Sequence, residues 1–284
     1  MHNDLMKICL ELKNAALAAG DILIKDFKDE LPGKRDGSKT SIASSNIIVS
    51  YLLNSWFASE KDDIAVVSGA LILPKIAKLK DDSYILEDFE RGIAEFTGSC
   101  IAVDSLCAKE SFERGLRDFC ISIAYLDNRQ VKAAVVFDPI HVELFHAVCG
   151  LGAYMNGKSI SASNTKNIIE SCLSVSHRAL RMAEMDALRS LLGQAMSIRT
   201  SLSAPIDMCY VACGRLDAAI NINLAFYEYA AGLLIANEAG VKLLCPDGGM
   251  LALVESLGKR KSIAATCPGI ANDIAYLADS FNIH

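Results

Sequence analysis

The sequence has little charge and no long apolar run, and these two shortages exclude several classes of protein. Charged residues make up 22% and hydrophobic residues 52% of the 284 positions, so the chain is too apolar to be a solvated, disordered polymer. No apolar segment approaches the length of about 18 residues that a membrane-spanning helix needs. The net charge of −6 opposes contact with a phosphate backbone, so direct nucleic-acid binding is not expected.

The sequence also lacks the marks of an export signal and of a zinc site. The segment MHNDLMKICLELKNAALAAG mixes charged and apolar residues at helical spacing, unlike a signal peptide, and we expect a cytoplasmic protein. The ten cysteines include no CxxC pair, and the five histidines are scattered. Most of the cysteines have apolar neighbours in the sequence, so we expect reduced thiols packed in a core rather than disulfides or metal ligands.

Helical and strand-like hydrophobic periodicities follow one another along the chain. The N-terminal region has an apolar stripe at helical spacing. The middle of the chain alternates apolar and polar residues between turn signals, which is typical of antiparallel strands. The predicted helices cover 4–28, 45–57, 203–213 and 228–239, the predicted strands include 119–125, 131–138 and 216–224, and the hairpin turns are predicted at Asp127-Asn128 and Asn156-Gly157.

An antiparallel meander followed by alternating helices and strands predicts an α/β fold, more narrowly a layered α+β sandwich. We expect two lobes. The first, residues 1–155, carries the antiparallel sheet and a candidate metal-site motif, and the second, residues 156–284, is an α/β lobe.

Two acidic residues lie where a strand gives way to a helix. Asp104 follows an apolar strand in CIAVDSLCAKESF, and Glu228 opens a helix in NINLAFYEYAAGLL. A carboxylate beside a helix N-terminus is suited to holding a cation next to a phosphate. The alternative is a structural role, as a helix cap for Asp104 or a favourable first-turn charge for Glu228.

Two long segments and one short loop, together with the segments around Asp104 and Glu228, point to one family over nearly the whole chain. The two segments and the loop are AAVVFDPIHVELFHAVCGLGAYMNGKSISAS, SAPIDMCYVACGRLDAAININLAFYEYAAGLLIANEAG and KRDGS at 34–38. Together they resemble the inositol monophosphatase family, above all its bacterial extragenic-suppressor and 3′(2′),5′-bisphosphate nucleotidase branches. The resemblance implies alternating helix and sheet layers, a homodimer, and Mg²⁺-dependent hydrolysis of a small phosphorylated metabolite. In that reaction carboxylates hold the cations that position the attacking water.

The family motif DP(I/L)DGT is altered in this chain. Its first Asp is kept as Asp104, and Leu106 would still offer a backbone carbonyl to a cation. Its second, cation-bridging Asp is replaced by Cys107, and the threonine that helps to orient the water is replaced by Lys109. By resemblance, Cys107 and Lys109 occupy the catalytic positions, and Ala108 and Lys109 would contact the substrate.

The family motif WDxAAG is altered as well. It reads YEYAAG here, so the Asp ligand has become the longer Glu228. The substrate-contacting Glu seven residues earlier falls on Asn221, which would then be substrate-binding. An Asp that usually follows the lysine-led loop falls near Ser44-Ser45 and is lost.

The Glu-Glu pair of the family has two possible positions. If the strand before it is IAVVSGA, the pair has become Gly69-Ala70 and is lost. If that strand is SYILED, Glu87 and Asp88 replace it, and the step of 17 residues from Glu87 to Asp104 is kept. The second alignment requires an insertion before residue 83. Both alternatives stay open, and the second adds Glu87 to the metal ligands Asp104, Leu106 and Glu228.

The substitutions predict a weakened site. Magnesium prefers oxygen ligands, and a thiol is a soft ligand that it does not favour. The Lys109 ammonium could replace part of a missing cation's charge, or it could face solvent while Cys107 packs. A thiol nucleophile at Cys107 is a further alternative. We therefore expect weak or absent magnesium-dependent hydrolysis, and we keep two other roles: a protein-contact function with transcription-machinery proteins, and a phosphate-ligand sensor.

Overall fold

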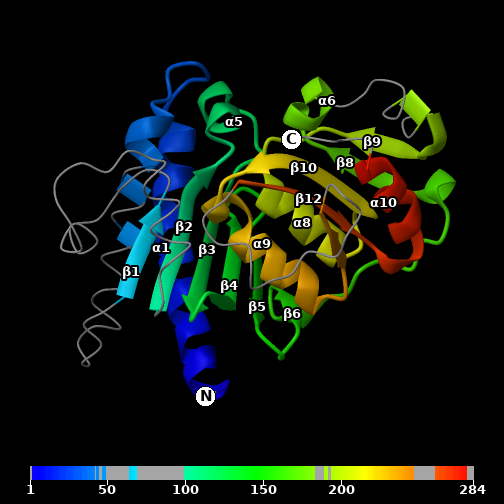
Figure 1. Cartoon of the computed structure of the whole chain (residues 1–284). Helices are drawn as coiled ribbons and strands as arrows, with labels where there is room; N and C mark the ends of the chain where they lie inside the picture. Colours follow the sequence, from blue (N-terminus) through cyan, green and yellow to red (C-terminus); the bar gives the residue numbers. More distant parts are fainter. Residues whose placement is uncertain are drawn as a thin grey trace.

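Two sheets and three layers of helices alternate in the computed structural model (Figure 1). The structure describes residues 2–41, 43–44, 47–48, 64–68, 99–182, 189–190, 193–245 and 260–279. The first sheet has the strand order β1-β2-β3-β4-β5-β6-β7, in which β1 runs parallel to β2 and the later neighbours are antiparallel. Its strands are β1 (Ile64–Ser68), β2 (Ser99–Cys107), β3 (Cys120–Asp127), β4 (Gln130–Asp138), β5 (Glu143–Val148), β6 (Ala153–Met155) and β7 (Lys158–Ser159).

The second sheet mixes parallel and antiparallel pairs, with the order β11-β12-β10-β8-β9. Its central strand β10 runs parallel to β8 and antiparallel to β12. The strands are β8 (Cys172–Val175), β9 (Ser197–Arg199), β10 (Ala218–Leu224), β11 (Lys242–Leu244) and β12 (Lys261–Thr266).

The helices cover both outer faces and fill the space between the sheets (Figure 1). α1 packs on the outer face of the first sheet, where Leu12 and Leu23 are fully buried. α8 and α9 lie between the sheets and share one core with both of them. α6 and α10 cover the outer face of the second sheet. These helices are α1 (His2–Asp29), α6 (His177–Met182), α8 (Ala204–Ala212), α9 (Phe226–Glu238) and α10 (Ala271–Asp279), and the short α5 (Lys109–Arg114) follows β2.

The structure confirms the predicted layered α/β fold and most of the predicted elements. The hairpin turn at Asn156-Gly157 forms where it is expected, and both residues adopt the positive φ values that such a turn requires. The turn predicted at Asp127-Asn128 lies one residue later, at Asn128-Arg129, between Asp127 of β3 and Gln130 of β4. The largest difference in a boundary is at the helix after the lysine-led loop, which already begins at residue 37. Asp36 caps it, because its Oδ1 accepts a hydrogen bond from the Lys39 N–H at 3.2 Å. Most of the predicted helix 45–57 lies outside the described residues.

The proposed division into lobes 1–155 and 156–284 stays a prediction. Its boundary falls inside the hairpin between β6 and β7, and both of these strands belong to the first sheet. Within the described part of the chain, no helix combines the length and the apolar character needed to cross a bilayer.

Close packing of α8 against α9 gives a test of the central layer. A Cβ atom at Gly232 would lie 3.0 Å from Met208 Sδ and 3.3 Å from Pro205 Cα. We therefore expect Gly232→Val to lower the free energy of unfolding by about 1–3 kcal/mol, measured by chemical denaturation. The control is Gly193→Ala, a helical position where an added Cβ would meet no atom of the described residues within 4 Å. It should leave stability unchanged or raise it slightly, and equal losses in the two variants would contradict this account.

Candidate functional site

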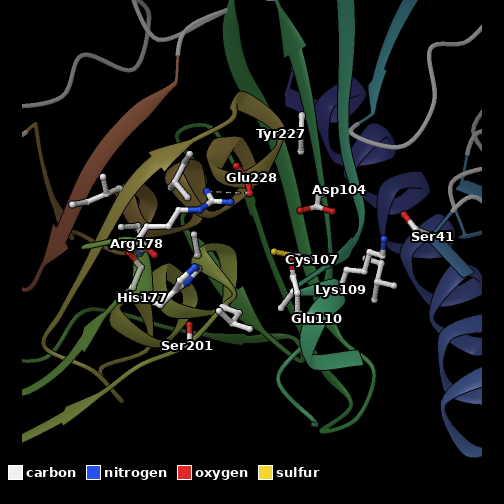
Figure 2. Close-up of a pocket in the computed structure, with 18 of the residues that line it drawn as sticks. Ser41, Asp104, Cys107, Lys109, Glu110, His177, Arg178, Ser201, Tyr227 and Glu228 are labelled. Carbon is white, nitrogen blue, oxygen red and sulfur yellow. Dashed lines mark ion pairs between the residues drawn. The ribbon is translucent and has the colours of Figure 1, made fainter. Parts of the chain in front are cut away.

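A cavity of about 240 Å³ opens where the two sheets meet the central helices (Figure 2). Its walls come from the end of β2 and the start of α5 on one side, and from the end of β10 and the starts of α6 and α9 on the other. The sequence predicted Asp104, Leu106, Cys107, Ala108, Lys109, Asn221 and Glu228 as site residues, and all of these line the cavity. The tertiary structure thus brings together two motifs that are far apart in the chain.

Asp104 lies on β2, near a register shift between Asp104 and Cys107 in its pairing with β3. Burial, and after it the negative charge of Glu228, raise the pKa of the Asp104 carboxyl to about 7, against the opposing effect of hydrogen bonds from Cys107 and the Leu106 amide. The two carboxylates are therefore close enough to interact. Such a pair favours a cation or a proton between its members.

Glu228 occupies the first turn of α9, as the sequence indicated, and two local partners hold its carboxylate. Its Oε2 accepts a hydrogen bond from the Ala225 N–H at 2.5 Å, which caps the helix. Its Oε1 lies 3.7 Å from Nη1 of Arg178 (Figure 2). The carboxylate is thus already shared between a helix terminus and a guanidinium.

Cys107 ends β2 directly opposite Cys120 on β3 and is 5% exposed. Its Sγ accepts a hydrogen bond from the Ser203 hydroxyl at 3.5 Å, and that hydroxyl also lies 3.4 Å from the Cys120 thiol. The hydrogen bond with Cys120, together with burial, raises the pKa of the Cys107 thiol well above its ordinary value. A protonated, packed thiol is what this setting favours, which weighs against a nucleophilic role.

Lys109 is the first residue of α5, and its ammonium is held on the side of the N-terminal loop. Its Nζ donates to the Ser38 hydroxyl at 2.6 Å and lies 3.6 Å from Glu113 Oε1. Ala108 before it adopts a left-handed φ of 62°, a conformation that favours glycine and matches the glycine of the family motif. Both residues line the cavity, and their contacts with a substrate stay a prediction.

Asn221 lies on β10 and is 2% exposed. Its Nδ2 is buried and has no hydrogen-bond partner among the residues that the structure describes. Buried amide donors are nearly always paired. An unpaired donor in the wall of a cavity therefore suits a ligand that brings an oxygen acceptor.

Ser44, one of the two residues near which the further Asp of the family falls, is fully buried and donates to the Ser105 carbonyl at 3.2 Å. Beside it, the Ser105 hydroxyl donates to the Ser41 carbonyl at 2.9 Å. Ser41 and Ser44, in the helix that begins at residue 37, are thus hydrogen-bonded to Ser105 near the end of β2, and the side chain at residue 44 has a structural role.

Of the two candidate positions for the Glu-Glu pair, Glu87-Asp88 and Gly69-Ala70, both lie outside the described residues. The strand directly before Gly69-Ala70 is described. β1 runs parallel to β2 with Ser68 opposite Val103, the residue before Asp104.

Sequence reasoning did not find Arg178 and His177, which line the cavity from the start of α6 (Figure 2). Both follow β8 in the segment CLSVSHRAL. No local pattern there sets these side chains apart from other surface cations. Only the pairing of β8 with β10 carries Arg178 to Glu228.

The described residues fit a magnesium ion poorly. Asp104, Glu228 and the Leu106 carbonyl supply oxygen, but a buried thiol and a guanidinium stand beside them. No group of three or more His, Cys, Asp or Glu side chains in the described ranges is arranged to hold a metal ion. Magnesium requires several oxygen ligands at near-octahedral geometry, so this donor set predicts weak affinity.

Comparisons with known proteins agree on one family. A model of the inositol monophosphatase family matches residues 11–279. A protein of Pasteurella multocida named "Nus factor SuhB" is 30% identical over 92% of this chain and 91% of its own length. An "Inositol-1-monophosphatase" of Bacillus subtilis is 32% identical over 56% of this chain and 59% of its own length.

Solved structures show the same fold. The extragenic suppressor protein suhB of Bartonella henselae superposes with a TM-score of 0.75 at 23% identity, covering 95% of this chain and 97% of its own. The inositol monophosphatase II of Staphylococcus aureus gives a TM-score of 0.77 at 19% identity, covering 98% and 96%.

Asp207 on α8 supports the wall of the cavity and gives a test by pH. Its Oδ2 accepts hydrogen bonds from Ser201, a lining residue, at 2.7 Å and from Ser174 at 2.8 Å. Burial raises its pKa from 3.8 to about 6, against the opposing effect of these hydrogen bonds. The folded state thus binds the proton more tightly than the unfolded chain, and stability should fall as pH rises from about 4 to about 6.

We expect the stability advantage of Asp207→Asn over the native protein to grow across that pH range, measured by denaturant unfolding at each pH. Asp21→Asn, at an exposed position on α1, controls for the loss of one negative charge. A constant difference for Asp207→Asn between pH 4 and pH 7 would show that the carboxylate is not penalised by its surroundings.

Proposed function

The chain belongs to the inositol monophosphatase family, and on that basis we propose that its cavity binds a small phosphorylated metabolite while magnesium-dependent hydrolysis there is weak or absent. The observation that carries the proposal is that the cavity has few acidic side chains free to bind a cation among the described residues. Asp104 and Glu228 face one cavity, but Glu228 is paired with Arg178. Cys107 stands where the family motif has a second aspartate.

The loss of one carboxylate matters because hydrolysis by this family's route needs cations at defined places. Cations neutralise the phosphate and position the attacking water. A thiol in place of the bridging carboxylate and a guanidinium on Glu228 both lower the affinity for a second cation. Even changes around the ligands commonly cost about 10–100-fold in metal affinity.

The pairing of β1 with β2 supports the alignment in which Gly69-Ala70 replaces the Glu-Glu pair. In that alignment IAVVSGA is the strand next to Asp104, and β1 is formed by the first five residues of this segment. The site would then lack both acids of the pair. Glu87 as a metal ligand stays a prediction.

A second candidate function is protein contact without catalysis. It is favoured by relatives that are named "Nus factor SuhB", one of which matches 92% of this chain. In this role the chain would act as a homodimer that binds a transcription-machinery protein. The two functions differ in what they require of the cavity, because a contact function would tolerate the substitutions at Cys107 and Lys109.

The first test measures phosphate release from inositol 1-phosphate and from adenosine 3′,5′-bisphosphate, with Mg²⁺ and then with Mn²⁺. We expect turnover near the background of the Asp104→Asn variant, because the cation sites are incomplete. Robust turnover that Asp104→Asn abolishes would contradict the proposal and would make Asp104 the anchor of a working metal site.

The second test restores the family motif. We expect Cys107→Asp combined with Lys109→Thr to raise Mg²⁺ affinity, on the order of 10-fold or more, because a hard carboxylate replaces a thiol and a cation leaves the rim. Calorimetric titration with Mg²⁺ measures the change. Lys109→Thr alone is the control, since this side chain is partly exposed and bonds to Ser38. An unchanged titration in the folded double variant would show that other ligands are missing as well.

A further inference from the structure

We propose that the guanidinium of Arg178 binds the phosphate group of the ligand directly, so that binding needs no divalent cation. The inference rests on the proposed function, in which this cavity takes a phosphorylated metabolite. It assigns the anion-binding role to a residue that belongs to neither of the two motifs used to recognise the family. The class of ligand is a phosphate monoester, held by a permanent cation and an amide donor.

Arg178 is well placed for this contact. It lines the cavity from α6, and its side chain is 41% exposed. Its Nη1 donates to the Asn223 carbonyl at 3.2 Å and lies 3.7 Å from Glu228 Oε1. A guanidinium carries five N–H donors. Among the residues that the structure describes, Nη1 makes the contacts that hold the side chain in place, and the donors on Nε and Nη2 have no hydrogen-bond partner and can serve a ligand.

A guanidinium is suited to phosphate for reasons of geometry and charge. It is planar, it stays protonated at all relevant pH values, and it can donate two parallel hydrogen bonds to a phosphate. Arg178 also offsets the charge of Glu228, which would otherwise repel an anion. These are the two tasks that a cation performs in a metal-dependent site, charge neutralisation and positioning of the phosphate.

Asn221 provides an independent sign of a ligand in the same cavity. Its side chain is 2% exposed, and its Nδ2 has no partner within the described ranges. It lies two residues before Asn223 on β10, the strand whose carbonyl anchors Arg178. A ligand oxygen that accepts a hydrogen bond from Nδ2 would satisfy this buried donor.

A second guanidinium shares the anchor of Arg178. Arg260 donates from Nη1 to the same Asn223 carbonyl at 2.9 Å, although it is exposed and is not one of the residues that line the cavity. The two guanidinium groups at this carbonyl repel each other, and a nearby anion would offset that repulsion. Arg260 therefore serves as a matched control for Arg178, with the same chemistry and the same anchor but a different position.

The experiment is calorimetric titration of the full chain with inositol 1-phosphate, in EDTA and then in Mg²⁺. We expect native protein to bind with the same affinity, within about threefold, in both buffers. Arg178→Ala should weaken binding in EDTA on the order of 10-fold or more, as for a lost charge-assisted pair. Arg178→Lys should fall between the two, because it keeps the charge but loses the planar fork. Arg260→Ala should stay within about threefold of native.

Binding that requires Mg²⁺ would overturn the inference and leave the proposed function standing. Equal weakening by Arg178→Ala and Arg260→Ala would also overturn it, because the effect would then come from net charge alone. Failure of native protein to bind in either buffer would overturn the proposed function and, with it, this inference. A thermal unfolding scan of each variant identifies any that has lost the fold.

Titration with Mg²⁺ alone separates this role from a merely structural one, because a structural role for Arg178 would not change the affinity for Mg²⁺. Removing the guanidinium releases Glu228 from its ion pair. We therefore expect Arg178→Ala to bind Mg²⁺ several-fold more tightly than native protein, whereas Arg260→Ala should not. Unchanged Mg²⁺ affinity in a folded Arg178→Ala variant would show that Arg178 does not stand in for a cation.

Discussion

The packing of the central helix layer between two sheets is the constraint on which the rest of the structure depends. α8 and α9 share one apolar core with the inner faces of both sheets, and Gly232 allows them to approach closely. This packing fixes where α9 begins and thereby places Glu228 opposite Asp104 of β2. Without it, the two halves of the cavity would belong to separate pieces of the chain, and neither half alone holds more than part of a site.

The balance of charge in the cavity distinguishes this chain from a strong metal-binding site. Asp104 has a raised pKa because it is buried and faces Glu228, and Glu228 is partly neutralised by Arg178. Glu228 therefore already has a partner other than a divalent cation, and the raised pKa of Asp104 means that its surroundings disfavour an isolated carboxylate. A cavity arranged in this way can hold an anionic ligand more readily than a cluster of magnesium ions, whose coordination needs several unengaged oxygen atoms.

The substitution at Cys107 is embedded in its surroundings. The thiol faces Cys120 across the β2–β3 pair and is bridged to it by the Ser203 hydroxyl. Likewise, Ser44 and Ser105 fill with hydroxyl hydrogen bonds the region where the early helix meets β2. Neighbouring residues are thus packed and hydrogen-bonded around the altered positions. An acid placed at residue 107 would be buried beside a second thiol, at a cost in desolvation unless a cation binds it.

The sequence by itself determined the layered fold, most of its long elements and two of the acidic residues that line the cavity. Helical stripes and strand alternation are local and periodic, so α1, the β3–β4 hairpin, α8, β10 and α9 could all be predicted, and the two family-like motifs identified Asp104 and Glu228. Only the tertiary structure decided what those acids face. Arg178 reaches Glu228 because β8 pairs with β10, and the Lys109 ammonium turns to Ser38 instead of Asp104. Contacts of this kind join segments that are distant in the chain and leave no periodic signal, because they depend on how whole layers pack.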